Sequence, residues 1–365
     1  MNELNNLKPI NEWFKKLDSR PIIISGPCSA ESEEQVLNTA RQLKEIDQVK
    51  IFRAGIWKPR TRPNAFEGRG DDALHWLNQV KLETGLLTTV EVASPKHVEM
   101  CLRHNVDILW IGARTTSNPF SIQELASALQ GMNVPVMIKN PLNPDINLWI
   151  GALERINKAG ITRLAAIHRG FYPFEQTSLR NIPKWEIPIE LKSRFHNLPL
   201  ICDPSHIAGD RKYIQQISQK ALDLNMDGLM IESHFNPEIA LSDVDQQVMP
   251  SELNTILNSL VCRLSIKDGE DYNPLDQYRN QIDSIDAQFI ELLAQRMNTV
   301  SEIGEYKSEQ NLNILQLKRW EKVREQGTEL GKSLGLSEKF LTQLLRMIHK
   351  EAILIQNDVM NHKKE

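Results

Sequence analysis

Cysteine is scarce in this 365-residue sequence, which contains Cys28, Cys101, Cys202 and Cys262. No two of them form a C-x-x-C pair, so the spacing favours neither a disulfide framework nor a zinc knuckle and indicates reduced thiols. The net charge is also small, −4 with a pI near 6.2, and provides no basic field for nucleic acid or an anionic membrane. No apolar run approaches the roughly 18 residues of a membrane span, and residues 1–13 do not resemble a signal peptide. We therefore expect a cytoplasmic protein without nucleic-acid or membrane partners.

Short apolar runs alternate with helix-length amphipathic segments over the first two thirds of the chain. The runs expected to be strands are residues 21–25, 50–56, 86–92, 107–113, 134–139, 163–169, 198–203 and 227–233. This alternation predicts an α/β fold with a parallel sheet. Eight such units in about 240 residues predict a (β/α)8 TIM barrel, whose active site lies at the carboxyl ends of the strands.

Four candidate metal ligands follow strands that would be neighbours in a closed barrel. Cys28 follows the first expected strand, His206 follows the seventh, and Glu232 and Asp243 end or follow the eighth. A thiolate, an imidazole and two carboxylates suit Mn, Fe, Co or Zn better than Ca. We expect Mn²⁺ as a redox-inert Lewis acid, and an exposed, oxidisable Cys28 thiol. A purely structural Cys28, and His234 in place of His206, are the alternatives.

Cations also gather at the expected mouth of the barrel, although the chain is acidic overall. They follow strands two, four, five and six and comprise Arg53, Lys58, Arg60, Arg114, Lys139 and Arg169. Arginine offers a rigid bidentate fork for phosphate or carboxylate, which lysine supplements as a point charge. The cluster predicts substrates with several negative charges, for example two phosphorylated compounds.

These residues lie in motifs that resemble the type I 3-deoxy-D-arabino-heptulosonate 7-phosphate (DAHP) synthases, in their short beta branch. The motifs are GPCS (26–29), FRAGIWKPRT (52–61), IGAR (111–114), IHRG (167–170), DPSH (203–206) and ALSD (240–243). The resemblance covers residues 20 to about 260. It implies condensation of phosphoenolpyruvate with erythrose 4-phosphate, the first step of the shikimate pathway, at a divalent metal held by Cys28, His206, Glu232 and Asp243.

The same resemblance implies separate binding sites for the two substrates. Erythrose 4-phosphate is expected at Arg60 and Thr61, and Lys58 is expected to be catalytic as well as substrate-binding. The residues expected to bind phosphoenolpyruvate are Arg53, Lys58, Arg114, Lys139 and Arg169. Two alternatives stay open: a 3-deoxy-D-manno-octulosonate 8-phosphate synthase, which carries Lys-Ala-Asn-Arg-Ser where this chain has KPRT (58–61), and a Schiff-base aldolase that uses Lys139.

The last quarter of the chain has a different pattern. A polar segment, residues 262–273, is expected to link a barrel domain (1–261) to an all-α domain (274–365) of three helices, of which the later two cover about 315–332 and 337–359. In the first helix, Arg296 takes a position of the apolar stripe. Lys307 lies about 20° around the helix and roughly 16 Å further along it. The two cations can therefore address one pocket, unless Arg296 pairs with a structural carboxylate.

This segment resembles the all-helical chorismate mutases. The matching substrate-binding residues are Arg279, Arg296, Lys307, Arg319 and Gln356. The resemblance implies rearrangement of chorismate to prephenate, with the arginines on the carboxylates and Lys307 and Gln356 at the ether oxygen; Arg296, Lys307 and Gln356 are expected to be catalytic.

Two features bear on how this domain works. Trp320 and Ala352 depart from the family, which usually has an acidic residue and often a serine there. Arg279 lies about 100° from the face of Arg296, which agrees with the family's intertwined homodimer. A bifunctional enzyme is the favoured interpretation; alternatively, the helices mainly sense chorismate or prephenate and regulate the barrel allosterically.

Overall fold

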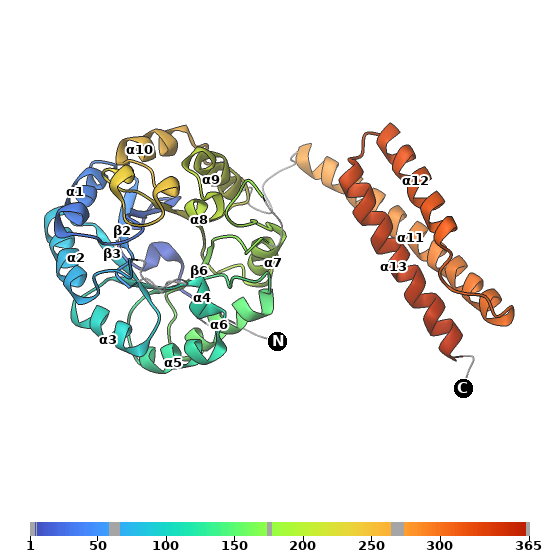
Figure 1. The fold of residues 1–365 in the computed structure, drawn as a ribbon, viewed down its shortest axis with the longest axis horizontal. Helices are drawn as coiled ribbons and strands as arrows, with labels where there is room; N and C mark the ends of the chain where they lie inside the picture. Colours follow the sequence, from blue (N-terminus) through green and yellow to red (C-terminus); the bar gives the residue numbers. More distant parts are fainter. Residues whose placement is uncertain (1–3, 5, 58–65, 174–176, 264–273, 363–365) are drawn as a thin grey trace. The chain divides into compact units, whose positions relative to one another are not determined.

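A computed structural model describes residues 4, 6–57, 66–173, 177–263 and 274–362 of the chain (Figure 1). The chain divides into two compact units, Met1–Ser265 and Ile266–Glu365. Most of the expected linker, residues 264–273, lies outside the described residues. No helix among the described residues is long and apolar enough to cross a membrane.

The first unit is a closed barrel of parallel strands in sequential order, as the sequence predicted. The strands are β1 (Ile22–Gly26), β2 (Val49–Ala54), β3 (Leu87–Val92), β4 (Ile108–Ile111), β5 (Val136–Lys139), β6 (Leu164–His168), β7 (Leu200–Cys202) and β8 (Gly228–Glu232). Each of them falls within, or within one residue of, an apolar run that was expected to be a strand.

The longer helices surround the barrel (Figure 1), and two short helices directly follow the ends of β4 and β7. The helices are α1 (Glu33–Lys44), α2 (Asp71–Thr84), α3 (Pro95–Arg103), α4 (Ala113–Thr116), α5 (Pro119–Leu129), α6 (Ile146–Lys158), α7 (Glu186–Arg194), α8 (Pro204–Ala208), α9 (Ile214–Asp223) and α10 (Pro250–Ser259). Several begin with a side-chain cap, such as Asp203, whose carboxylate accepts from the His206 backbone N–H. This cap places DPSH at the start of α8.

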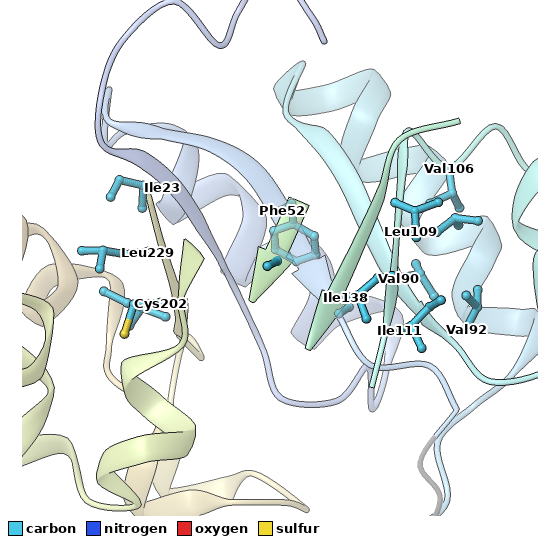
Figure 2. Packing of buried hydrophobic residues seen from close by; sticks show 14 of the residues in the cluster. Ile23, Phe52, Val90, Val92, Val106, Leu109, Ile111, Ile138, Cys202 and Leu229 are labelled. Carbon is cyan, nitrogen blue, oxygen red and sulfur yellow. The ribbon is translucent and has the colours of Figure 1, made fainter. Parts of the chain in front are cut away.

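Alternating side chains of each strand build two layers of core. On β1, Ile22 and Ile24 point into the barrel, whereas Ile23 points out toward the helices. The outward layer is shown in Figure 2, where Ile23, Leu229 and Cys202 lie on neighbouring strands. Because the period is two, a residue that follows an inward apolar side chain by two positions also points inward.

Close packing of two strands at the mouth requires a glycine. Gly26 has φ of +148°, and a Cβ atom there would lie 2.1 Å from the Arg53 carbonyl oxygen. Any side chain would therefore push β1 away from β2. The glycine of GPCS brings Cys28 next to the end of β2.

The second unit consists of α11 (Pro274–Glu309), α12 (Leu317–Ser333) and α13 (Glu338–His362), which confirms the predicted three-helix, all-α domain. Both α11 and α12 pack on α13. Gly331 allows the close approach of α12, since a Cβ atom there would lie 2.4 Å from Leu341 Cδ2.

Replacing His168 with Phe is expected to make the barrel less sensitive to acid. His168 points outward from β6 among Trp149, Phe171 and Trp185, and burial lowers the pKa of its imidazole to about 3. An unfolded histidine has a pKa near 6.5, so unfolding takes up a proton below that pH. The contribution of neutral His168 to the free energy of unfolding is complete above pH 6.5 and is lost as the pH falls toward 3. At pH 4.5 the loss amounts to about 3 kcal/mol.

Urea unfolding between pH 7 and 4.5, followed by tryptophan fluorescence, measures this effect. The His168→Phe variant should show a shallower loss of unfolding free energy than the wild type. A His196→Phe variant changes an exposed ring and should keep the wild-type slope. Equal slopes for all three proteins would contradict the assignment.

Candidate active site at the barrel mouth

Charged side chains point inward where the strands end. They continue the inward-facing positions of β2, β5, β6, β7 and β8 and comprise Arg53, Lys139, Arg169, Asp203 and Glu232. All five residues are buried. Buried charges need partners, so their pairing defines the site.

Arg53 on β2 and Glu232 on β8 form an ion pair, and the two strands flank β1. Arg53 Nη2 lies 3.1 Å from Glu232 Oε1, and the side chains are 1% and 0% exposed. Burial by itself would lower the pKa of Arg53, but Glu232 and Asp203 raise it above its ordinary value. The guanidinium also lies over the Trp110 ring, 5.0 Å from its centroid. Arg53 is therefore a permanent, fixed cation.

Asp203 organises a second group of partners. Its Oδ2 lies 2.7 Å from Lys139 Nζ and 2.9 Å from His206 Nδ1. Burial would raise the pKa of Asp203, yet the hydrogen bond from His206 Nδ1 and the neighbouring Lys139 hold it well below its usual range. Lys139 is thus engaged as the ammonium of an ion pair, which disfavours the amine chemistry of a Schiff-base aldolase.

Three of the four predicted metal ligands come together. Cys28, Glu232 and Asp243 each offer one ligand atom, and these atoms all lie within 4.8 Å of one another. The Cys28 thiol donates to Asp243 Oδ2 at 3.0 Å. A thiol with two carboxylates is a donor set that fits Mn, Fe, Co or Zn.

The expectation of an exposed Cys28 thiol is wrong, because the residue is 0% exposed. The segment after β8 covers it: Asp243 contacts the thiol, and Gln247 Oε1 accepts from the Cys28 backbone N–H at 2.9 Å. The expected ease of oxidation therefore loses its basis, since reaction of a thiol requires access as well as thiolate character.

The two candidate histidine ligands differ in their surroundings. His206 Nδ1 lies 3.8 Å from Glu232 Oε1 and contacts Asp203, an arrangement that leaves Nε2 as a possible ligand atom. Burial lowers the pKa of His206, which favours the neutral imidazole that binds metals. His234 instead faces Glu31 at 3.9 Å and accepts from the Asn236 N–H, so its contacts lie outside the ligand group.

The remaining cations line a cavity above these pairs. Its lining residues include Glu91, Arg114, Lys139, Arg169, Arg180, His206 and Asp243. Burial lowers the pKa of Arg169 to about 10, so the guanidinium is still charged at neutral pH. Lys58, Arg60 and Thr61 lie outside the described residues.

Several residues of this mouth are not among those predicted from the sequence. Glu91 accepts from Trp110 Nε1 at 3.1 Å and lies in the same cavity; the inward parity of β3 was the available signal. Arg180, Gln246 and Gln247 contact candidate ligands. The glutamines lie three and four positions after Asp243, but Arg180 comes from a long connection without a periodic pattern.

The helical unit brings two predicted residues into contact. Lys307 Nζ donates to Gln356 Oε1 at 3.0 Å and to the Ile314 carbonyl at 2.6 Å. The residues are 7% and 8% exposed, and burial lowers the pKa of Lys307. This polar pair lies where α11 packs on α13.

Predicted arginines of this unit lie at the surface of the single chain. Arg279, Arg296 and Arg319 are all exposed, so Arg296 is not buried inside the three-helix unit. Burial is the largest cause that lowers the pKa of His349, and the charges of Arg296 and Lys307 lower it further. These charge effects indicate that the three residues share one region. Arg279 is seventeen residues from Arg296, about 25 Å along the helix, and lies in a different place.

Trp320 stacks on His349 in the same region. The ring centroids are 4.0 Å apart with an interplanar angle of 9°. His349, Ala352 and Gln356 are spaced by three and four residues and share one face of α13. The wall of the site near Trp320 is therefore aromatic instead of acidic.

Comparisons with known proteins agree with this division. Residues 9–263 match the model of the DAHP synthetase I family, and residues 278–357 match that of chorismate mutase type II. A phospho-2-dehydro-3-deoxyheptonate aldolase of Thermotoga maritima is 32% identical over 246 residues, which are 67% of this chain and 68% of that protein. A 2-dehydro-3-deoxyphosphooctonate aldolase of a Cyanothece strain is 26% identical over 266 residues, 67% of this chain and 92% of that protein. The crystal structure of a Thermotoga maritima DAHP synthase superposes with a TM-score of 0.59 at 30% identity and covers 65% of this chain and 67% of its own.

Proposed function

Since the chain belongs to the DAHP synthetase I family and carries a chorismate mutase type II domain after its barrel, we propose that it catalyses two reactions. The barrel condenses phosphoenolpyruvate with erythrose 4-phosphate to DAHP, and the helices convert chorismate to prephenate. Both families are enzymes of the shikimate pathway. The observation that carries the first activity is the group of Cys28, Glu232 and Asp243 next to inward-facing cations.

The cations at the mouth bind phosphoenolpyruvate in this proposal. Arg114, Lys139 and Arg169 line one cavity and would hold its phosphate and carboxylate. Arg53 is anchored by Glu232 and Trp110 and adds a fixed positive charge. C3 of the enol phosphate would attack the aldehyde carbon and water would add at C2, after which the C2–O bond to the phosphate would break and release inorganic phosphate. The cations would hold the phosphate and carboxylate in place through these steps and stabilise the negative charge of the departing phosphate.

A divalent metal would be held by Cys28, Glu232, Asp243 and His206. When bound, Mn²⁺ or a similar ion supplies a Lewis acid for the aldehyde oxygen. Asp203 orients the His206 ring through Nδ1 and is linked to Lys139. The same carboxylate therefore couples the candidate metal ligand to the phosphoenolpyruvate site.

Chelation is expected to abolish the first activity and to leave the second unchanged. Purified protein would be treated with chelator and resupplied with Mn²⁺, and the consumption of phosphoenolpyruvate and of chorismate would be followed by absorbance. Arabinose 5-phosphate in place of erythrose 4-phosphate is the control for the octulosonate alternative. Metal-independent condensation, or a preference for arabinose 5-phosphate, would overturn the proposal for the barrel.

A homodimer through the helices is part of the proposal. The α11 face around Ile282, Ile285, Phe289 and Leu292 is 44–63% exposed in the single chain, which is unusual for so large an apolar stripe. A second copy would cover it. Each copy would also supply its Arg279 to the site of the other copy, because Arg279 and Arg296 of one chain lie too far apart to share a site.

A sensory role for the helices is the second candidate, favoured by the Trp320–His349 stack. The Trp320 indole offers no acceptor for a ligand hydroxyl where the family usually has a carboxylate, which favours ligand binding without efficient catalysis. We expect saturating prephenate or chorismate to slow the condensation by about 5- to 150-fold, a typical range for allosteric coupling. Unchanged initial rates of phosphoenolpyruvate consumption with both ligands would contradict the sensory role.

A further inference from the structure

The outer contacts of the candidate metal ligands converge on two side chains. Arg180 Nη1 donates to Asp243 Oδ1 at 2.9 Å and to Gln246 Oε1 at 2.5 Å. Gln246 Nε2 in turn donates to Glu232 Oε2 at 2.5 Å. One connected set of hydrogen bonds thus reaches two carboxylates of the ligand group.

These bonds select which oxygen of Asp243 faces Cys28. Arg180 engages Oδ1, whereas Oδ2 is the atom that accepts from the Cys28 thiol. Asp243 also has a left-handed backbone, with φ of 49° and ψ of 46°, a conformation that needs support from its surroundings. Because Arg180 fixes Oδ1 of Asp243, Oδ2 is oriented toward the Cys28 thiol.

Arg180 and Gln246 are themselves held firmly. The Arg180 backbone N–H donates to the Ala208 carbonyl at 3.1 Å, and a Cβ atom at Gly209 would lie 2.4 Å from Arg180 Cβ. Gln246 is 1% exposed. A buried amide with both ends bonded has one orientation, because reversing it would place donor against donor.

We propose that Arg180 and Gln246 are positioning residues that orient Asp243 and Glu232 for the divalent metal. This inference rests on the metal-dependent condensation proposed above. Outer partners of metal ligands typically account for 10- to 100-fold in metal affinity. Arg180 and Gln246 would act through the ligands and would not touch the metal.

Two charge-conserving substitutions test this inference. Gln246→Met keeps the length of the side chain and removes both hydrogen bonds, and Arg180→Lys keeps the charge but cannot present the guanidinium fork. Arg211→Lys is the matched control, because Arg211 binds Glu238 and the Val244 carbonyl in the same segment and contacts no candidate ligand. Thermal unfolding of each metal-free, full-length protein checks the fold.

The measurements are Mn²⁺ affinity, from the electron paramagnetic resonance of free Mn²⁺, and the thiolate and ligand-field absorption bands of bound Co²⁺. We expect Gln246→Met and Arg180→Lys each to weaken Mn²⁺ binding by roughly 10- to 100-fold and to shift the Co²⁺ bands, with Arg211→Lys unchanged. The double variant should bind Mn²⁺ about as weakly as the weaker of the two single variants, because both substitutions disrupt the same set of hydrogen bonds and their effects should not add.

Different outcomes separate the possible failures. Wild-type affinity and Co²⁺ spectra in both variants would overturn the positioning role. If Gln246→Met does not fold, Arg180→Lys decides, because the Arg180 side chain is 43% exposed and tolerates substitution more readily. Absence of Mn²⁺ binding by the wild-type protein would instead refute the metal site itself.

Discussion

A Cys28→Ala variant is expected to lose metal binding and to slow the condensation by on the order of 10³-fold, with the chorismate rearrangement unchanged. Cys28 is the one sulfur in the group with Glu232 and Asp243. Loss of a ligand removes several kcal/mol of transition-state stabilisation by the metal, and about 4 kcal/mol corresponds to this factor. Phosphoenolpyruvate and chorismate consumption, with Mn²⁺ binding measured in parallel, check the result.

Cys101→Ala is the matched control for this experiment. Cys101 is also fully buried, on α3, where burial raises the pKa of its thiol to about 12. Its removal costs stability through lost packing but should preserve Mn²⁺ affinity and both activities. Condensation by Cys28→Ala at the wild-type rate would show that the thiol is structural.

A Lys307→Met variant is expected to slow the chorismate rearrangement by about 10²- to 10³-fold, with DAHP formation unaffected. Removal of one preorganised donor from a site that stabilises developing charge has this effect. Lys307 is held by Gln356 and the Ile314 carbonyl, so its ammonium is already oriented before substrate binds. Initial rates of chorismate consumption measure the loss.

Lys332→Met provides the control on the same domain. Lys332 pairs with Glu338 at 2.8 Å on an exposed surface and lies away from the polar pair. Its substitution should leave both rates unchanged, because exposed ion pairs contribute little. A Lys307→Met variant that retains full mutase activity would assign this lysine to structure alone.

Much of the barrel could be predicted from the sequence. The eight apolar runs correspond to β1–β8, since buried parallel strands read as short continuous hydrophobic segments. Arg53, Lys139 and Glu232 could be placed at the mouth because each lies at an inward position in the last two residues of its strand. Whether a strand residue faces into or out of the barrel alternates along the strand, so it can be predicted from neighbouring residues in the sequence.

Other parts of the site could not be predicted because they depend on contacts between distant segments. Burial of Cys28 results from the segment around Asp243 and Gln247, more than two hundred residues later. Arg180 reaches Asp243 from the connection after β6, which shows no period. No local pattern encodes how a loop folds over another strand end.

The sequence by itself determined the eight strands of the barrel, their order and the all-α segment that follows, because hydrophobic periodicity is a property of neighbouring residues. Only the tertiary structure decided which pairs form: Arg53 with Glu232, Lys139 with Asp203, and Lys307 with Gln356. Each pair joins residues at least forty-nine positions apart. Their selection depends on burial and distance in the folded chain, where a charge without a partner is too costly to keep.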